Sequence, residues 1–329
     1  MIKHGNISVF VPHIGCPHRC SFCDQNAITG KVAVPTAEDV KAAVNEAKSH
    51  QDYNPKVTEL AFFGGSFTAI EKGYMLELLT AGYEFVKSGD ILGIRVSTRP
   101  DAIDEEILSL LKGYGVTAIE LGCQSLSDEV LRLNHRGHTA AQVQTASRLI
   151  KQNGFSLGLQ MMTGLYGDSD EIALETAEKI ISYGADTVRI YPTIVLSGTY
   201  LHKLLKEGKY RPQTVDEAVE LTAKLLEMFE NSNTKVIRVG LHSIESDRFV
   251  AGPWHSAFGE LCKSRVLLNK VLKMIKKQNI KKGDLVIEVP KNMVSIVVGQ
   301  KKANIEILKK MGYNCKIIQS DIEDIRFKI

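Results

Sequence analysis

The sequence Ile7-Ser8-Val9-Phe10-Val11 is followed, a few residues later, by Cys16-Pro17-His18-Arg19-Cys20-Ser21-Phe22-Cys23. The first stretch has the apolar character of a buried β-strand, and the second holds three cysteines with C-x3-C-x2-C spacing. Thiolates this close together are soft ligands suited to an iron–sulfur cluster or to zinc. A cubane held by only three thiolates keeps one iron free of protein ligands. The stretch therefore predicts a metal centre with an open position for chemistry, just after a strand.

Other uses of these cysteines remain open on the spacing alone. A structural zinc site needs a fourth ligand, which His13 or His18 would supply. A disulfide pair is not expected, because the chain has six cysteines in 329 residues and no export signal. The cluster is the favoured interpretation.

Composition places the chain among globular proteins with room for one large core or two smaller ones, since 44% of its 329 residues are hydrophobic. The start of the sequence, residues 1–5, lacks the apolar run of a signal peptide. No apolar run approaches the ~20 residues of a membrane span. We therefore expect a cytoplasmic protein without a membrane partner.

The net charge of +3 hides an asymmetry between two parts of the chain. Residues 263–329 carry 16 Lys and Arg against 6 Asp and Glu, whereas residues 1–262 carry 25 against 32. This shift predicts two domains, 1–262 and 263–329, the second small and basic. Basic surface is often merely solvated, so charge alone leaves a nucleic-acid partner open.

Short apolar runs alternate with longer amphipathic stretches as far as residue 230. The expected strands are Ile7–Val11, Val57–Phe63, Gly93–Ser97, Val116–Gly122, Phe155–Met162 and Thr187–Tyr191. The expected helices are Ala37–Ser49 with Thr36 as its N-cap, Ala69–Val86, Asp104–Lys112, Asp128–Gln152, Asp170–Ser182 and Val215–Glu230. Six strand–helix units predict an α/β fold with parallel strands, a partial (β/α)6 barrel of the TIM type, although a doubly wound sheet would read similarly.

Polar residues and glycines recur where these strands end, which is where parallel α/β folds gather their active sites. Burying an unpaired polar group is costly, so each polar residue needs a partner, either a ligand or another side chain. For Glu120 the alternative is an ion pair with Arg99, and for Arg189 the carboxylate of a ligand is one candidate. Cys123, inside a strand, is expected to be a core residue. The candidate ligand-binding residues are Gly64, Gly65, Ser66, Thr98, Arg99, Glu120, Gln124, Gln160, Arg189 and Tyr191.

The cysteine spacing resembles that of the radical S-adenosylmethionine (SAM) enzymes, whose partial barrel matches the strand–helix pattern. The resemblance implies a [4Fe–4S] cluster on Cys16, Cys20 and Cys23, with SAM on the open iron. It also implies that one electron breaks a C–S bond of SAM and gives a 5′-deoxyadenosyl radical. Phe22 is then expected against SAM through backbone contacts, and the pair Gly64-Gly65 near its amino group.

The resemblance narrows further when longer segments are compared. Residues 1–265 resemble the radical SAM domain of the Elongator catalytic subunit and its bacterial relatives, and coproporphyrinogen-oxidase-like proteins match less of the chain. The segments that carry the resemblance are FFGGSFTA (62–69), STRPDAI (97–103), IELGCQS (119–125), NHRGHT (134–139) and YPTIVLSGTYLHKLLKEGKY (191–210).

Elongator's catalytic subunit modifies the wobble uridine of tRNA, which implies RNA, tRNA or rRNA, as the substrate. The present sequence has no segment like the acetyltransferase domain or the basic amino-terminal extension, and its first two cysteines are closer together, so acetyl-CoA chemistry is not expected. The resemblance also implies an electron donor such as a flavodoxin or ferredoxin. The alternatives are a small-molecule or peptide substrate, or a non-catalytic zinc-stabilised RNA-binding protein.

The basic C-terminal segment, residues 263–329, would bind RNA. From Asp284 onward it reads as a small α/β module, joined to the barrel by a helix over Leu267–Ile275. An Ile/Val run, the turn Gly299-Gln300-Lys301-Lys302 and a following helix resemble a KH-like unit, in which a GxxG loop clamps the nucleotide backbone. Lys302 stands where the second glycine belongs. Lys301 and Lys302 are the candidate RNA-binding residues, with a basic accessory domain or dimerisation cap as the alternative.

Overall fold

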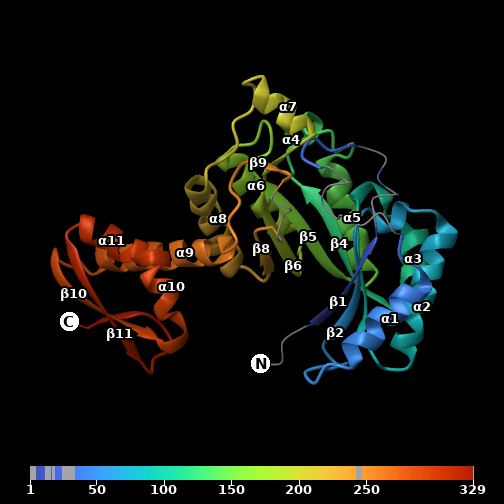
Figure 1. The fold of residues 1–329 in the computed structure, drawn as a ribbon, viewed down its shortest axis with the longest axis horizontal. Coiled ribbons are helices and arrows are strands. Elements are labelled where there is room, and N and C mark those ends of the chain that lie inside the picture. Colours follow the sequence, from blue (N-terminus) through green and yellow to red (C-terminus); the bar gives the residue numbers. More distant parts are fainter. Residues whose placement is uncertain (1–4, 12–15, 17–18, 24–33, 242–246, 329) are drawn as a thin grey trace.

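The computed structural model describes residues 5–11, 16, 19–23, 34–241 and 247–328. Within these residues, seven parallel strands pair in the order β1-β2-β3-β4-β5-β6-β8 and curl into an open half-barrel (Figure 1). The predicted α/β fold of a partial barrel is thus confirmed, with one strand more than expected. The strands are β1 (Gly5–Val11), β2 (Thr58–Gly64), β3 (Gly93–Thr98), β4 (Val116–Gln124), β5 (Ser156–Thr163), β6 (Thr187–Pro192) and β8 (Lys235–Val239).

The two faces of the sheet differ in character because successive side chains of a strand point to opposite sides. In β1, Ile7, Val9 and Val11 are buried in the main apolar core, whereas Asn6 and Ser8 on the other face are exposed. Helices cover the core face on the outside of the half-barrel (Figure 1). The concave inner face is left for polar side chains.

The helices of the barrel begin where the sequence provides caps. Thr36 caps the first of them and forms a capping box with Asp39, as predicted. The covering helices are α1 (Ala37–Lys48), α2 (Lys72–Lys87), α3 (Glu105–Gly113), α5 (Ala140–Gln152), α6 (Asp170–Ser182) and α8 (Val215–Glu230). Short 3-10 turns are η2 (Phe67–Ala69), η3 (Pro100–Ala102), η4 (Lys291–Met293) and η5 (Gln300–Lys302).

The helix expected over residues 128–152 is divided into α4 (Asp128–Leu133) and α5. The break follows from His135 and Gly137, whose φ angles of 54° and 70° are incompatible with a right-handed helix. The segment between the two helices, 134–139, reaches the carboxyl edge of the sheet instead.

Several elements between β6 and the end of the barrel were not predicted. Strand β8 forms the outer edge of the sheet, and with Lys235 and Arg238 in five residues it lacks the apolar run of the other strands. Helix α7 (Tyr200–Lys206) and the short antiparallel pair β7 (Val195–Leu196) and β9 (Phe249–Ala251) lie between β6 and the C-terminal elements.

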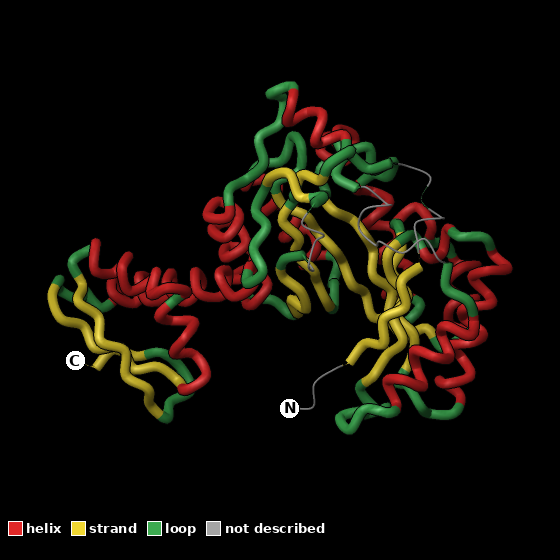
Figure 2. Tube along the Cα trace, viewed as in Figure 1, coloured by secondary structure: helices red, strands yellow, loops and turns green. Residues whose placement is uncertain are grey.

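The C-terminal residues form a separate small unit with its own core, visible beside the barrel in Figure 2. Its central strand pairs in parallel with one neighbour and antiparallel with the other. The Ile/Val run at 296–298 lies in a helix. The elements are α9 (Phe258–Lys277), β10 (Gly283–Pro290), α10 (Val294–Val298), α11 (Ala303–Lys310), β11 (Tyr313–Ser320) and β12 (Arg326–Lys328).

Helix α9 joins the two units, and the expected boundary at 262/263 falls inside it. Its first turns, through Phe258 and Cys262, pack on α8. Its later turns, through Leu268 and Val271, belong to the core of the C-terminal unit. Within the described ranges no helix, α9 included, is long and apolar enough to cross a bilayer.

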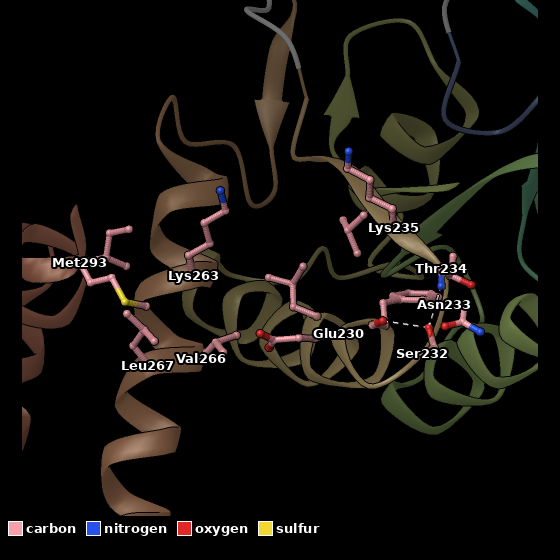
Figure 3. A pocket seen from close by; sticks show the side chains of 13 residues that line it. Glu230, Ser232, Asn233, Thr234, Lys235, Lys263, Val266, Leu267 and Met293 are labelled. Carbon is pink, nitrogen blue, oxygen red and sulfur yellow. Dashed lines mark hydrogen bonds between the residues drawn. The ribbon is translucent and has the colours of Figure 1, made fainter. Parts of the chain in front are cut away.

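A cavity of about 540 Å³ lies between the two units, lined by α8, α9, the start of β8 and Met293 (Figure 3). Thr234 and Lys235 place it at the amino end of β8. Because the strands are parallel, the cysteine segment, which follows the carboxyl end of β1, lies at the opposite edge of the sheet. This cavity is therefore not part of the candidate site.

Candidate functional site

The cysteine segment is held at the carboxyl edge of the sheet by hydrogen bonds from two distant parts of the chain. The Ser21 hydroxyl donates to Asn134 Oδ1 at 2.6 Å, and the Ser21 N–H donates to the Asn134 carbonyl at 3.1 Å. The N–H of Leu201 in α7 donates to the Ser21 carbonyl at 2.9 Å. Figure 1 shows α4, α7 and β9 gathered at this end of the sheet. Segment 134–139 and α7 thus position the cysteines.

The three thiols are partly buried and not in disulfides. Cys16 Sγ lies 3.9 Å from the Ser66 hydroxyl, and Cys20 Sγ accepts a hydrogen bond from Arg136 Nη1 at 3.0 Å. The Cys23 N–H closes a turn onto the Cys20 carbonyl at 3.1 Å. Buried Ser66, in the turn after β2, and buried Arg136, in the segment after α4, therefore adjoin the cysteines.

Cysteine thiolates are the donors that hold iron–sulfur clusters. Within the part of the chain that the structure describes, no three His, Cys, Asp or Glu side chains are grouped as ligands of one metal ion. Each thiolate of an iron–sulfur cluster binds a different iron, so the three cysteines on one loop need not converge on a point. His13 and His18, the zinc ligands of the alternative, lie outside the described residues.

Phe22 lies beneath the cysteine segment, where its ring contacts two small apolar clusters. One contains Val195 and Leu201, and the other contains Met162 and Leu165. The side chain thus anchors the segment to the rim of the half-barrel. Its expected backbone contact with SAM stays a prediction.

The pair Gly64-Gly65 ends β2 directly beside the end of β1. A Cβ on Gly64, whose φ is 116°, would lie 2.3 Å from the Phe10 ring and 2.7 Å from the Val11 carbonyl oxygen. The Gly65 N–H donates to the same carbonyl at 3.0 Å. Close packing of the two strands therefore accounts for Gly64, and the expected contact of both glycines with SAM stays a prediction.

Thr98 faces away from the concave side of the sheet. Its hydroxyl lies 2.6 Å from that of Thr68, and it is 5% exposed. Alternation along β3 instead places Ser97 on the concave face with Arg95. The partner that the buried Thr98 hydroxyl needs is thus another side chain, and its contact with SAM or substrate stays a prediction.

The Arg99 guanidinium is hydrogen-bonded to groups of the protein itself. Its guanidinium pairs with Asp101 through two contacts of 2.9 Å and donates to the Arg136 carbonyl at 2.8 Å. Burial opposes ionisation of Asp101, but the hydrogen bonds and charge of Arg99 lower the pKa of that carboxyl below its usual value. The alternative ion pair between Arg99 and Glu120 is therefore wrong.

Glu120 pairs instead with Arg189 across the concave face, at 2.8 Å. Arg189 Nη1 also donates to the Tyr191 hydroxyl at 3.4 Å. Burial favours the neutral form of Arg189, yet the Glu120 charge raises its pKa, and burial raises the pKa of Tyr191 against the charge of Arg189. The Glu120 carboxylate is thus the anion that a buried Arg189 requires, and the SAM carboxylate is not needed to explain the position of this arginine.

Gln124 and Gln160 extend this polar face. Gln160 Nε2 donates to Gln124 Oε1 at 3.1 Å. Gln124 has a φ of 64° at a shift in the β4–β5 register, which turns its side chain out of the regular ladder. Gln160 also pairs in register with Arg189, so the structure brings Glu120, Gln124, Gln160 and Arg189 together. Their contact with SAM or substrate stays a prediction.

Cys123 is fully buried, and burial raises the pKa of its thiol to about 12. Its predicted role as a core residue is confirmed.

Two arginines and an asparagine were missed by sequence analysis. Arg136 and Asn134 belong to the NHRGHT segment, whose residues alone predict no role for either side chain. Arg238, paired in register with Arg189, lies beside Tyr191 on the unpredicted strand β8. Within the described residues no carboxylate lies within 4.0 Å of Arg238, whose Nε donates to the Gly240 carbonyl at 3.3 Å.

The turn with the two lysines connects α10 to α11 in the C-terminal unit. Lys301 and Lys302 are exposed, and both adopt left-handed conformations, with φ of 51° and 63°. Behind them, Asn304 is buried and donates to the backbone and side chain of Ser264 in α9. The lysines are thus held outward, away from the cysteine segment in sequence and in fold.

Comparison with known proteins places the chain. The family model of the radical SAM superfamily matches residues 10–180, and that of a radical SAM C-terminal domain matches residues 185–267. Elongator complex protein 3 of Homo sapiens is 31% identical over 63% of this chain and 41% of its own length. An uncharacterised protein of Methanocaldococcus jannaschii is 25% identical over 82% of this chain and 84% of its own length.

Among solved structures, Elp3 of Methanocaldococcus infernus has a TM-score of 0.65 at 22% identity, over 84% of this chain and 63% of that one. At that identity the likeness shows the fold. The chain spans less than two thirds of this structure and of the human relative. The resemblance to the Elongator catalytic subunit is nonetheless confirmed in sequence and in fold. Because the family model covers more than half of its residues, the chain belongs to the radical SAM superfamily of enzymes.

Proposed function

We propose that the protein uses a [4Fe–4S] cluster on Cys16, Cys20 and Cys23 and SAM to modify RNA, either tRNA or rRNA. The observation that carries this proposal is that three cysteines, none of them in a disulfide, share a segment anchored at the carboxyl edge of the half-barrel. When bound, the cluster and SAM supply an organic radical that abstracts hydrogen from a substrate. An external donor such as a flavodoxin or ferredoxin would provide the electron.

The chain's own residues bind and orient these groups. Ser66 lies next to Cys16, and Arg136 next to Cys20, so both would border the cluster. The concave face offers the Glu120–Arg189 pair, the two glutamines and Tyr191 for hydrogen bonds to SAM or to the substrate. Arg238 adds a cation without a carboxylate partner among the described residues, which favours an anionic group such as a phosphate nearby.

RNA as the substrate rests on two lines of support. Several relatives are named tRNA uridine(34) acetyltransferases, among them one of Dehalococcoides mccartyi, 27% identical over 63% of this chain. The C-terminal unit carries the excess of positive charge and presents Lys301 and Lys302 on an exposed turn between two helices. That turn resembles the backbone-clamping loop of KH domains.

The cluster is tested with anaerobically reconstituted protein. The wild-type chain should gain iron, sulfide and the visible absorbance of an iron–sulfur cluster, and should form 5′-deoxyadenosine from SAM with a reductant. Cys20→Ala should lose both properties because it removes one of three ligands. Cys315→Ser, in the C-terminal unit, is the matched control and should retain them. About one zinc and no iron per wild-type chain would refute the proposal.

The substrate is tested by comparing modified nucleosides in tRNA and rRNA from cells with and without the gene. A nucleoside missing without the gene should return with the wild-type gene and with Cys315→Ser, but not with Cys20→Ala. Identical nucleosides in all strains would refute RNA as the substrate and direct attention to a small molecule or peptide.

A further inference from the structure

Arg136 is a buried guanidinium in direct contact with one of the three cysteines. The residue is 7% exposed, and its Nη1 lies 3.0 Å from Cys20 Sγ. Its Nη2 donates to the Gly122 carbonyl of β4 at 2.6 Å, which fixes the plane of the group. The Arg136 carbonyl accepts a hydrogen bond from Arg99, so both ends of the residue are held.

No carboxylate of the described residues balances the charge of Arg136. In the described part of the chain no carboxylate lies within 4.0 Å of its guanidinium, and Asp101 is taken up by Arg99. Burial and then the charges of Arg136 and Arg99 lower the pKa of the neighbouring His138 to about 3, so this ring stays neutral. Among the residues that the structure describes here, two guanidinium groups, those of Arg99 and Arg136, therefore lie near a single carboxylate, that of Asp101.

A buried cation without a counter-charge is costly, and such groups are normally paired or bound to an anion. The sulfur atom at the end of the Arg136 guanidinium is the group able to supply that anion, as a thiolate ligand. Hydrogen bonds to ligand sulfurs and nearby charge are among the factors that set the potential of an iron–sulfur cluster.

We infer that Arg136 is the counter-charge of the cluster on Cys20 and raises its reduction potential. The inference rests on the proposed function, since it requires the cluster. Reduction adds one electron, and a positive charge with an N–H donor at the sulfur stabilises the more negative, reduced state. Arg136 is thus a positioning residue that acts through Cys20, and it would ease electron transfer from the external donor.

The inference is tested by redox titration of the reconstituted protein, followed by the electron paramagnetic resonance signal of the reduced cluster. Arg136→Met removes both charge and donor and should lower the reduction equilibrium constant about tenfold, which is ~59 mV for one electron. Arg136→Lys keeps the charge and should shift less. Arg132→Gln, an exposed arginine on α4, is the matched control and should titrate as wild type.

A second measurement covers the case in which Arg136→Met fails to fold. In wild-type protein labelled with ¹⁵N-arginine, pulsed electron paramagnetic resonance of the reduced cluster should show a hyperfine coupling between the cluster spin and ¹⁵N. That coupling should disappear in equally labelled Arg136→Lys. A loaded Arg136→Met cluster at the wild-type potential, or the absence of that coupling, overturns the inference alone. Failure of the wild-type chain to take up iron overturns the proposed function together with it.

Discussion

Asp168 follows β5 in a loop that lines a second cavity, of about 970 Å³, between the barrel and α11. Its Oδ2 accepts the Gly164 N–H at 3.0 Å, but its Oδ1 is buried without a partner among the described residues. Burial is the main cause that raises the pKa of this carboxyl to about 7, while the backbone donors oppose the shift. Ionisation of Asp168 therefore lowers the free energy of unfolding, and this effect depends on pH.

The sign of that dependence follows from the raised pKa. The folded state holds the proton more tightly than the unfolded state, so the stabilisation is complete below the usual value of 3.8 and is lost as the pH rises through about 7. Asp168→Asn should therefore melt at a higher temperature than wild type at pH 8 and at nearly the same temperature at pH 4. Calorimetry at both pH values checks this. Asp216→Asn, exposed in the same cavity, should show no such difference, and an equal gain at both pH values would contradict the assignment.

Which residues are polar at the strand ends could be read from the sequence, but their partners could not. Glu120 and Arg189 lie 69 residues apart in the chain, and only the strand order and register bring them together. Thr98 and Ser97 are neighbours in sequence, and a shift of one residue exchanges the faces on which they lie. Arg136 gave no signal of its own, because its role depends on a contact with Cys20 across the site.

At the scale of elements, the turn between α10 and α11 combines an energetic cost with an exposed charge. Two successive lysines adopt left-handed conformations, which for residues with a Cβ cost roughly 1–2 kcal/mol each. A glycine at the second position would relieve that strain and restore the second glycine of the KH-like loop. The lysine thus costs stability that a glycine would not.

Lys302→Gly separates the two effects. We expect the free energy of unfolding to rise by about 1 kcal/mol, because glycine adopts this conformation without strain. We expect affinity for total tRNA to fall, and the slope of its logarithm against salt to decrease by about 1, because one phosphate contact is lost. Urea denaturation and filter binding at several salt concentrations measure the two quantities.

Asn279→Gly is the control, since Asn279 is also left-handed, with a φ of 51°, but carries no charge. It should gain a little stability and bind tRNA as wild type. Unchanged affinity of Lys302→Gly would refute the proposed role of the turn in RNA binding.

Most elements of the barrel follow from local signals. Each covering helix starts at or next to a capping residue visible in the sequence, such as Thr36 or Ser169, and the first six strands are apolar runs. Strand β8 could not be predicted because Lys235 and Arg238 interrupt its apolar pattern. It is stabilised by pairing with β6 at the sheet edge. The break between α4 and α5 at 134–139 could not be predicted either. The chain turns at His135 so that this segment can anchor the cysteine segment, which is distant in sequence.

At the scale of the whole molecule, α9 determines how the basic unit is carried by the barrel. The helix is continuous over 20 residues and contributes apolar side chains to the cores on both sides. Ion pairs also cross between α8 and α9, such as Arg265 with Glu220 at 2.6 Å, but these side chains are 29% and 41% exposed. Partly exposed pairs contribute at most about 1 kcal/mol. Apolar packing therefore holds the two units together.

Because apolar packing outweighs the ion pairs, two substitutions in α9 should differ widely in their effect on the free energy of unfolding. Phe258 is 3% exposed and packs on Ala218 and Val219 of α8, so Phe258→Ala should cost about 3–5 kcal/mol. Arg265→Ala should cost less than about 1 kcal/mol. Urea unfolding followed by fluorescence of Trp254, the single tryptophan of the chain, reports on the barrel side. Hydrogen exchange of β10 reports on the C-terminal unit, and it should accelerate in Phe258→Ala because α9 transmits the loss. Equal costs for the two variants, or unchanged β10 exchange in Phe258→Ala, would show that the units are coupled by charge or not at all.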